Sequence, residues 1–399
     1  MTDVLDSAGP AEAEAGGDPR TGASRSTRRV RIGVLGTGGI ATIPEGVLPN
    51  LHHIADKVEL VAVADLDLER ATRVARQYDV PECYGSLEEM LETADIDAVV
   101  NLTPIPAHAR TAMQILQAGK HLVVEKPIAT TLKDADAIIE TARAKGLTII
   151  CAPPDMLFRS YIEARRLIAA GTIGKVAFAR VRSSHGGPGG DPQGWPLDPS
   201  WFYQAGSGPL FDMGVYGIHE ITGLLGPAKR VSAFTGITEP TRTVRGEGPF
   251  AGKVIDVTAD DNCLFMLDFG GATFAVIDGT FNVLATRSPK VEVFGRRGVL
   301  NVYGPDNLDH PGGDALDLFR TDIAPGLDGW VSPESWPQIE DERRALLERA
   351  ILVDHLADVL LHGEANVLTA EHARHALEIM IAVTTSSREG RVVELATTF

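Results

Sequence analysis

The stretch GVLGTGGIA, residues 33–41, follows a run of β-branched residues and precedes a helical pattern. Gly36, Gly38 and Ala41 fit the pattern G-x-G-x-x-G/A, in which the first glycine permits a tight turn and the second lets the backbone approach a pyrophosphate. The N-terminus of the expected helix would then face the phosphate charge. The residues expected to bind a dinucleotide here are Gly36, Thr37, Gly38, Gly39 and Ile40.

An acidic residue stands where a dinucleotide site needs one. Asp65 ends the second predicted strand, 24 residues after Ala41, and is placed to accept hydrogen bonds from ribose hydroxyl groups. Leu66 follows, and the neighbouring sequence offers no evident cation for a 2′-phosphate, which Asp65 would repel. We therefore expect NAD as the cofactor in preference to NADP.

Strands and helices alternate from residue 29 to residue 152. Nearly continuous apolar strands of this kind are typical of a parallel sheet buried on both faces, so the pattern predicts an α/β Rossmann domain over 29–152. The predicted strands cover residues 29–36, 58–65, 81–84, 96–102, 120–126 and 147–152.

The pattern changes after residue 153, where strands follow one another in close succession. This arrangement favours an antiparallel sheet, and it predicts an α+β second domain over 153–399. A long polar loop is expected over 305–337, before two last helices at 341–363 and 370–390. The predicted strands cover residues 175–184, 229–237, 262–270, 272–283, 290–295 and 298–304.

Composition excludes several classes of protein. The chain carries 37 Lys and Arg against 54 Asp and Glu, so its net charge of −17 argues against nucleic-acid binding. No apolar run approaches the length of a membrane span, and three scattered cysteines indicate reduced thiols in a cytoplasmic protein. Residues 1–28 have almost no bulky apolar side chains and are expected to form a disordered tail.

Two strand ends in the first domain carry further candidate residues. Thr103 and Pro104 follow the fourth strand, where the chain would meet the cofactor crevice, and His108 begins the next helix. Glu125 and Lys126 end the fifth strand. Burial and a nearby oxidised nicotinamide would both lower the pKa of Lys126 toward that of a general base. A lysine that is merely paired in a salt bridge is the alternative.

The second domain contributes a helix with three proton-bearing side chains. Asp212, Tyr216 and His219 are four and then three residues apart, which places them within roughly 60° of arc on a regular helix. A core helix with satisfied polar groups is the alternative. Further candidate substrate contacts are Asp155, Arg159, His185 and Trp201. His372 and His375 have a spacing that metal ligands can have, but no carboxylates accompany them, so no metal site is predicted.

These motifs, in this order, resemble the Gfo/Idh/MocA oxidoreductases. The resemblance rests on GTGGIA, the acid after the second strand, TPIPAH, AGKHLVVEKP and GSGPLFDMGVYGIH, and covers residue 29 to the C-terminus. It implies a large open-faced sheet in the second domain, a nicotinamide cofactor and a carbohydrate-like substrate. It also implies a cis bond before Pro127, and a homodimer or homotetramer formed through the open sheet.

The same resemblance assigns catalysis to Lys126, Asp212 and the residue four positions later. That residue is Tyr216 here, in the D-x-G-x-Y version found in glucose–fructose oxidoreductases and dihydrodiol dehydrogenases, and His219 stands one turn further. We expect Lys126 and Tyr216 to contact one substrate oxygen, with Asp212 holding a neighbouring hydroxyl group. Two other functions stay open: a redox-neutral epimerisation or elimination assisted by NAD, and a regulator that senses dinucleotide without turnover.

Overall fold

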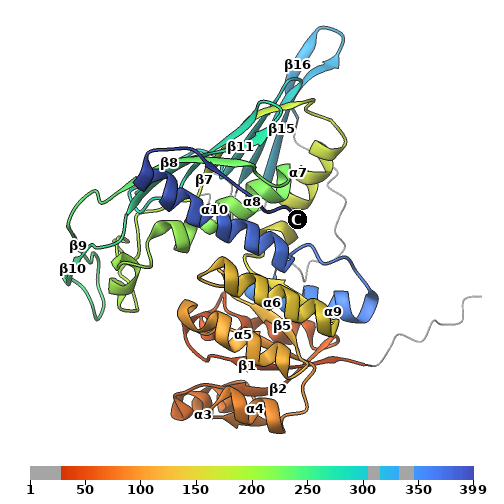
Figure 1. Ribbon diagram of the computed structural model, residues 1–399, viewed down its shortest axis with the longest axis vertical. Helices are drawn as coiled ribbons and strands as arrows, with labels where there is room; N and C mark the ends of the chain where they lie inside the picture. Colours follow the sequence, from red (N-terminus) through yellow and green to blue (C-terminus); the bar gives the residue numbers. More distant parts are fainter. Residues whose placement is uncertain (1–27, 304–314, 332–345) are drawn as a thin grey trace, which may run out of the picture.

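In this computed structural model, the residues described are 28–303, 315–331 and 346–399. Figure 1 shows two sheets that follow one another along the long axis of the molecule, each accompanied by helices. The early part of the chain builds one sheet, and the later part builds the other. The candidate site lies where the two parts meet.

The first sheet has six parallel strands in the order β3-β2-β1-β4-β5-β6. Reversal of the strand order beside β1 creates the crevice in which such sheets bind ligands, at the carboxyl ends of the strands. This sheet confirms the predicted Rossmann fold. Its strands are β1 (Val30–Leu35), β2 (Val58–Ala64), β3 (Glu82–Tyr84), β4 (Ala98–Asn101), β5 (His121–Val124) and β6 (Ile149–Cys151).

The helix expected after the glycine motif is interrupted. Helix α1 (Gly39–Thr42) ends within one turn, and α2 (Val47–Asn50) and a 3-10 turn, η1 (Leu51–Ile54), follow. Pro44 and Gly46 stand between α1 and α2, where proline lacks the N–H that a continuous helix requires. The further helices from this part of the chain are α3 (Leu68–Gln77), α4 (Leu87–Thr93), α5 (His108–Gln117) and α6 (Leu132–Lys145).

The second sheet has nine strands in the order β16-β15-β14-β13-β7-β12-β11-β8-β17. All neighbouring pairs are antiparallel except β7 and β12, which confirms a large, mostly antiparallel sheet. The strands are β7 (Val176–Arg182), β8 (Arg230–Gly236), β11 (Asn262–Gly270), β12 (Thr273–Asp278), β13 (Val291–Gly295), β14 (Gly298–Tyr303), β15 (Ala315–Ala324), β16 (Leu327–Val331) and β17 (Val393–Glu394). A separate short pair is β9 (Thr241–Thr243) with β10 (Val254–Asp256).

Strands β15 and β16 correct the expectation of a polar loop over 305–337. Leu316 and Leu318 stand on either side of Asp317, and both are buried where β15 pairs with β14. The buried positions are few, and the strand is recognisable only from its pairing with β14. The polar composition of the surrounding sequence therefore favoured a loop. The parts of the expected loop at 305–314 and 332–337 lie outside the described residues.

Helices cover one face of the second sheet and leave the other exposed (Figure 1). Helices α7 (Arg159–Ala169), α8 (Val215–Leu225) and α10 (Ala370–Glu389) pack on the covered face. None of the helices in the described part of the chain combines the length and the apolar character of a membrane span. Large apolar side chains on the exposed face include Phe178, Phe234, Leu264, Met266, Phe274 and Val276.

Helix α9 (Ile351–His362) returns to the first sheet after the second has been completed (Figure 1). It packs against β1, β2, β5 and β6. Lys57, directly before β2, places its Nζ 2.8 Å from an oxygen of Asp354 and 2.7 Å from an oxygen of Asp358. The sequence-based boundary at residue 153 places α9 with the second domain, although its packing is against the first.

Candidate active site

Two parts of the chain converge on the Lys126 ammonium. Lys126 follows β5 and precedes Pro127, and the peptide bond between them is cis, as expected. Lys126 Nζ donates a hydrogen bond to the backbone oxygen of Asp212 at 2.7 Å and lies 3.3 Å from Asp212 Oδ1. The same nitrogen is 5.1 Å from the centre of the Tyr216 ring. The residues predicted to act together therefore meet beside the carboxyl end of β5.

The segment carrying Asp212 is wound more widely than a regular helix. Residues Leu210–Gly214 form a π-helical turn, η5, which continues directly into α8. Such turns inside helices occur frequently at functional sites. Here the turn brings both the carbonyl and the carboxylate of Asp212 to Lys126, while Tyr216 lies in the first turn of α8.

The structure reverses the expected direction of the Lys126 pKa. Burial alone would lower it, but the nearby Tyr216, Asp212 and Glu125 outweigh burial, so the pKa of Lys126 is raised above its ordinary value. Lys126 is therefore an ammonium ion at neutral pH. Its charge is available to stabilise an oxyanion or to donate a proton, and the proton acceptor for alcohol oxidation must be another group.

His185 supplies an imidazole on the other side of Asp212. Its Nε2 lies 4.0 Å from Asp212 Oδ2. The backbone N–H of Gly187 donates to His185 Nδ1 at 2.9 Å, so a neutral ring carries its proton on Nε2, facing Asp212. Asp212 thus lies between an ammonium and an imidazole. The sequence had placed His185 among candidate substrate contacts, and its place beside Asp212 is compatible with that role.

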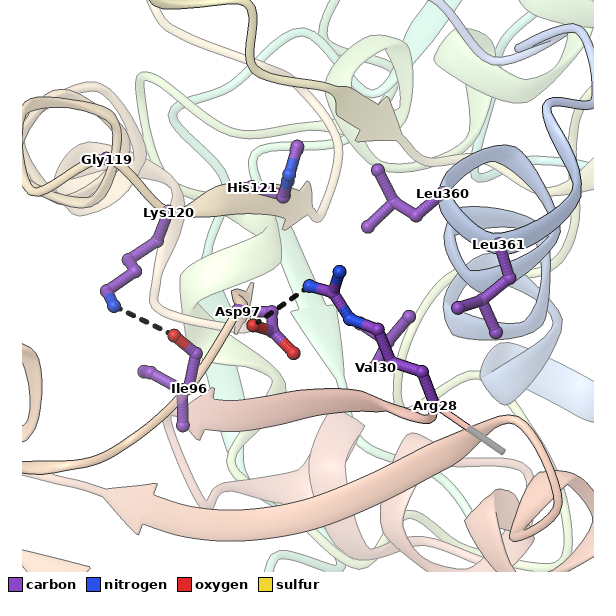
Figure 2. Close-up of a pocket in the computed structure, with 9 residues that line it drawn as sticks. All are labelled: Arg28, Val30, Ile96, Asp97, Gly119, Lys120, His121, Leu360 and Leu361. Carbon is purple, nitrogen blue, oxygen red and sulfur yellow. Dashed lines mark hydrogen bonds and ion pairs between the residues drawn. The ribbon is translucent and has the colours of Figure 1, made fainter. Parts of the chain in front are cut away.

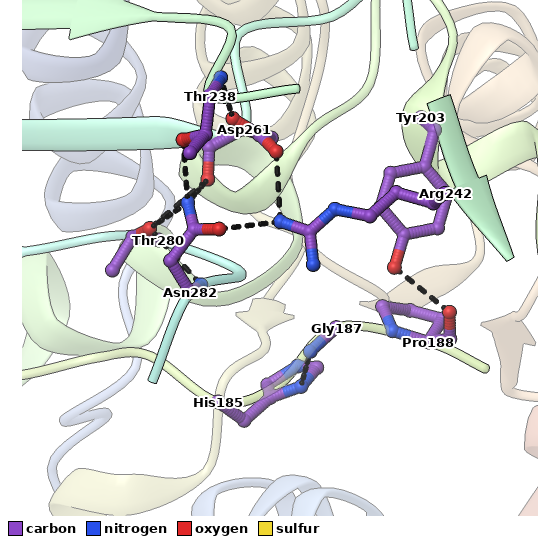
Figure 3. A network of polar contacts seen from close by, with 9 residues as sticks. All are labelled: His185, Gly187, Pro188, Tyr203, Thr238, Arg242, Asp261, Thr280 and Asn282. Carbon is purple, nitrogen blue, oxygen red and sulfur yellow. Dashed lines mark hydrogen bonds and ion pairs between the residues drawn. The ribbon is translucent and has the colours of Figure 1, made fainter. Parts of the chain in front are cut away.

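A polar network holds the loop that begins with His185 (Figure 3). The Tyr203 hydroxyl donates to the Pro188 carbonyl at 2.8 Å. Arg242 lies over the Tyr203 ring and forms an ion pair of 2.8 Å with Asp261, which is buried. These contacts join the loop to other segments of the second domain. We therefore expect the His185 imidazole to keep a fixed position beside Asp212.

His219 lies apart from this centre, contrary to the expectation that it shares the face of Tyr216. Relative to Tyr216, the helical step places His219 about 60° to one side and Glu220 about 40° to the other. The His219 ring packs at 4.6 Å from the ring of His372 on α10. Burial, followed by the charges of His372 and His375, holds the pKa of His219 well below its usual range. His219 is therefore a neutral packing residue between two helices.

The position taken by Glu220 reveals a second amine that the sequence interpretation missed. Lys290, directly before β13, places Nζ 2.8 Å from Glu220 Oε1 and 3.5 Å from Asp155 Oδ1. The same nitrogen is 5.7 Å from the centre of the Tyr216 ring. Asp155, a candidate substrate contact, is thus engaged with a cation. An acid four residues after Tyr216, in a helix with no other Asp, Glu, Lys or Arg, was the signal for this cluster.

Arg349 is a further residue that the sequence interpretation missed. It lies just before α9, and its Nη1 is 3.5 Å from Glu125 Oε1. Burial would lower the pKa of Arg349, but Tyr216 and Glu125 outweigh burial and raise it. Glu125 is thus occupied by an arginine from the C-terminal part of the chain. No motif surrounds Arg349, and nothing in its local sequence indicates that α9 packs on the first sheet.

The glycine turn has the shape that its sequence predicts. Gly36 has φ +92°, and a Cβ there would lie 2.8 Å from the Leu102 carbonyl oxygen, so glycine is required. A Cβ at Gly38 would meet no protein atom within 4 Å, which leaves its backbone open to a ligand. Gly39 lies near Leu197 of the second domain.

Asp65 is held by several donors, one of them a cation that the sequence interpretation overlooked. Arg70 pairs with Asp65 at 2.6 Å, and Thr37 and Asp67 donate backbone N–H groups. Burial would raise the pKa of Asp65, but the hydrogen bonds from Arg70, Asp67 and Thr37 outweigh it and lower the pKa to about 2. The expectation that no cation stands nearby is wrong, because helix α3 brings Arg70 back to the strand end.

The loop after β4 is tied to the turn at Lys126. Both ring nitrogens of His108, which is buried, lie 2.7 Å from carbonyl oxygens, one of Thr103 and one of Pro127. Thr103 also donates to Asn101 Oδ1, and Pro104 precedes a 3-10 turn, η2 (Ile105–Ala107). His108 therefore positions two loops at the crevice, and its contact with the cofactor stays a prediction.

Two candidate substrate contacts stay predictions. Arg159 begins α7, one turn after Asp155. Trp201 is 45% exposed and packs edge-on against Phe202 with ring centres 5.2 Å apart. An exposed aromatic face of this kind could pack on an apolar face of a ligand.

A cavity of about 480 Å³ lies at the other end of the first sheet, beside the amino ends of its strands (Figure 2). Its lining includes Val30, Asp97 and His121, which stand at or next to the starts of strands. Arg28 lies 3.8 Å from Asp97 at its rim. Ligands of such sheets bind at the carboxyl ends of strands, so this cavity is separate from the candidate site.

Comparison with known families covers both parts of the chain. Residues 30–152 match the oxidoreductase family with an NAD-binding Rossmann fold, and residues 161–301 match the GFO/IDH/MocA C-terminal domain. The chain belongs to the Gfo/Idh/MocA oxidoreductase family. Its first domain is therefore an NAD-binding Rossmann domain, and the open turn at Gly36 and Gly38 fits a dinucleotide.

Individual members of the family are distant from this chain. Over 273 residues it is 26% identical to trans-1,2-dihydrobenzene-1,2-diol dehydrogenase of Xenopus tropicalis, an alignment covering 68% of this chain and 74% of that protein. An NAD-binding oxidoreductase from Klebsiella pneumoniae superposes with a TM-score of 0.77 at 22% identity, over 93% of this chain and 100% of that one. An aldose–aldose oxidoreductase from Caulobacter crescentus, complexed with glycerol, superposes at 0.70 and 23% identity, over 92% and 100%.

Proposed function

We propose that this protein is an NAD(P)-dependent dehydrogenase that transfers a hydride between the nicotinamide and a hydroxyl-bearing or ketone carbon of a sugar, polyol or glycoside. The observation that carries the proposal is the convergence of Lys126, Asp212 and Tyr216 beside the carboxyl end of β5. A pure dinucleotide sensor would have no use for an ammonium, a carboxylate and a phenol gathered at one point. A chemical step that moves a proton needs such a set.

The chain itself supplies the proton chemistry. When bound, the nicotinamide accepts or donates the hydride. Tyr216 exchanges the proton of the reacting oxygen, and the Lys126 ammonium stabilises negative charge on that oxygen and on the phenol. Asp212 orients Lys126 and accepts a hydrogen bond from a neighbouring hydroxyl group of the substrate. His185, with its proton on Nε2, can donate to an adjacent oxygen.

A substrate with neighbouring hydroxyl groups suits this arrangement. Asp212 and His185 present an acceptor and a donor next to the pair that handles the reacting oxygen. The diol named for the Xenopus relative also carries two adjacent hydroxyl groups, which supports the same substrate class here. Trp201 would add an aromatic face for a sugar ring.

We propose NAD as the preferred cofactor, with NADP as an alternative that Arg70 makes accessible. Asp65 is placed to accept ribose hydroxyl groups, which favours NAD. However, Arg70 is 42% exposed while paired with Asp65, so its guanidinium could turn toward a 2′-phosphate. Competition between these two side chains would decide the preference.

The decisive experiment screens sugars, inositols and glycosides with NAD and with NADP, following NADH or NADPH by absorbance and identifying the ketone by NMR. Lys126→Met should abolish turnover while leaving dinucleotide binding intact, as measured by fluorescence titration. Lys57→Met is the matched control and should remain active, because Lys57 lies at the amino end of the same sheet, away from the candidate site. Normal oxidation by Lys126→Met would refute the mechanism. Ketone exchange without net NADH would indicate a redox-neutral cycle instead.

We further propose that two copies of the chain pair through the exposed face of the second sheet. Leu264 lies opposite Phe234, Met266 opposite Val276, and Phe274 opposite Phe178, so an exposed apolar pair spans each of these three neighbouring pairs of strands. An exposed apolar surface of this kind marks an interaction site. A second copy, as in a homodimer or in the dimers of a homotetramer, would cover it symmetrically.

A further inference from the structure

A serine hydroxyl is inserted into the backbone of the helical segment that carries Asp212 and Tyr216. In an α-helix, the N–H of Gly217 and the carbonyl of Met213, four residues earlier, form one hydrogen-bonded pair. Here the Gly217 N–H donates to Ser183 Oγ at 3.0 Å, and the Ser183 hydroxyl donates in turn to the Met213 carbonyl. The hydroxyl therefore bridges the two groups of one helical pair.

The widened turn of the helix lies directly beside this bridge. Residues Leu210–Gly214 form the π-helical turn η5, and the N–H of Val215 donates to the Leu210 carbonyl, five residues earlier. A side chain that inserts into the ladder of a helix is an identified cause of such departures from α geometry. In the same turn the Asp212 carbonyl reaches Lys126 Nζ at 2.7 Å. The bridge and the contact with Lys126 thus belong to one local distortion.

The sheet fixes the position of Ser183. This residue directly follows β7 and is 1% exposed. Its backbone N–H donates to the Asp278 carbonyl at 3.0 Å and lies 2.9 Å from Asp278 Oδ1. Asp278 ends β12, which is the parallel neighbour of β7. Two strands therefore hold the hydroxyl in place, and the helix is wound against a fixed point.

A glycine on the helix makes room for the bridge. A Cβ at Gly217 would lie 2.9 Å from Ser183 Cβ and 2.9 Å from Val181 Cγ1, which is closer than side-chain atoms pack. The missing side chain lets α8 approach β7 closely enough for the hydroxyl to reach the helix backbone. The bridge thus depends on two residues, a short hydroxyl at the strand end and a glycine on the helix.

We propose that Ser183 is a positioning residue for the reaction, because its hydroxyl sustains the π-helical turn that presents Asp212 to Lys126. This inference rests on the proposed function, since it concerns the same Lys126, Asp212 and Tyr216 set. It adds a residue at a strand end that acts through the helix backbone. Without the hydroxyl, the turn should tighten toward α geometry, and the Asp212 carbonyl should turn back toward the helix axis.

A crystal structure of Ser183→Ala tests the turn itself. The N–H of Val215 should donate to the Phe211 carbonyl, four residues earlier, as in a regular helix. Lys126 Nζ should no longer lie within hydrogen-bond distance of the Asp212 carbonyl.

Ser184→Ala is the matched control, because it removes a hydroxyl of the same size from the next residue. Ser184 is 4% exposed, and its hydroxyl donates to Asp278 Oδ1 at 2.7 Å. The variant therefore disturbs the same strand end without removing the bridge to the helix. It should keep the π-helical turn.

The Lys126 ammonium reports the same event in solution, without substrate or cofactor. In protein labelled with ¹⁵N-lysine, the ¹H–¹⁵N cross peak of this ammonium is followed near neutral pH, and Lys126→Met assigns it. Ser183→Ala should accelerate the exchange of the ammonium protons with water by about tenfold or more, the factor that corresponds to one lost hydrogen bond to a charged group. Ser184→Ala should leave the exchange rate unchanged.

In an active enzyme, the same variant should separate kcat from KM. Ser183→Ala should lower kcat by about 10²-fold, because a misplacement of about 1 Å can have an effect of that size. KM for NAD should stay unchanged, since the glycine turn and Asp65 lie in the first domain.

The outcomes separate this inference from the proposed function. An altered turn together with faster exchange in Ser183→Ala, both absent in Ser184→Ala, supports the inference even if no sugar is oxidised. An unchanged turn or an unchanged exchange rate overturns it, even if the wild type is an active dehydrogenase. Equal changes in Ser184→Ala also overturn it, because the loss of either hydroxyl would then suffice. If Ser183→Ala does not fold, Ser183→Cys, which keeps the shape with a weaker donor and acceptor, is measured in its place, and the same results decide.

Discussion

Replacing Tyr216 by phenylalanine tests the centre of the mechanism, because it removes one oxygen and little else. The ring would still pack at 5.1 Å from Lys126 Nζ, and α8 would keep its residues and its burial. Cofactor affinity and melting temperature should therefore stay close to the wild-type values. Since Lys126 is already an ammonium at neutral pH, no amine in this pair can take the proton that Tyr216 would have accepted.

The rate should fall accordingly. General acid–base catalysis contributes about 10²- to 10⁴-fold, or about 3 to 5 kcal/mol of activation free energy. We expect kcat for alcohol oxidation to fall within that range, with KM for NAD unchanged, in steady-state assays of NADH formation. His219→Asn is the companion variant: it should lower the melting temperature by disturbing the packing on His372, but leave kcat within a few-fold of wild type. A near-normal rate in Tyr216→Phe, together with a large loss in His219→Asn, would refute our assignment.

Four further predictions concern the cofactor preference, the stability that Asp65 contributes, the Lys126 pair and the exposed face. Arg70→Ala should raise KM for NADP by about tenfold or more, because a hydrogen bond to a charged group is worth about 1.5–3 kcal/mol, while KM for NAD changes little. Asp65→Asn should lower the free energy of unfolding by about 2 kcal/mol at neutral pH, because the pKa of Asp65 is about 2 in the folded protein. Denaturation at several pH values should show this difference above pH 4, and the difference should vanish toward pH 2. Asp212→Asn should lower the pKa of Lys126, moving the basic limb of ketone reduction to lower pH, which a pH–rate profile would reveal. Phe274→Arg should halve the mass measured by light scattering if the sheet face pairs two copies.

The first domain was predictable because its signals are local. The glycine turn, the acid at Asp65 and the apolar strands each need only a short window of sequence, and the structure places all three at the same crevice. The interruption of the helix after Gly39 was also predictable, since Pro44 and Gly46 are residues that end helices. A proline at position 44 removes a backbone donor, so the glycine motif can open only a short helix here.

The site was predictable only where residues share a motif. Lys126, Asp212 and Tyr216 carry recognisable neighbours, whereas Lys290 and Arg349 enter from a strand start and a helix approach that resemble any other. The prediction that His219 belongs to the site was wrong for a different reason. On a helical wheel His219 lies within roughly 60° of Tyr216, but α10 packs against the side of α8 that His219 faces. Which neighbour fills each side of a helix is tertiary information that one helix does not contain.

The return of α9 to the first sheet has a consequence for how the chain is made. Ile351, Leu352 and Leu356 on α9 are buried, and α9 packs against β1, β2, β5 and β6 of a sheet whose last strand ends at Cys151. The ribosome therefore completes the last strand of this sheet, at Cys151, 200 residues before it reaches Ile351, the first residue of α9 (351 − 151 = 200). Until then the nascent sheet presents a bare apolar flank, so binding competence should arise only after translation has nearly finished, and a fragment cut at residue 152 should aggregate.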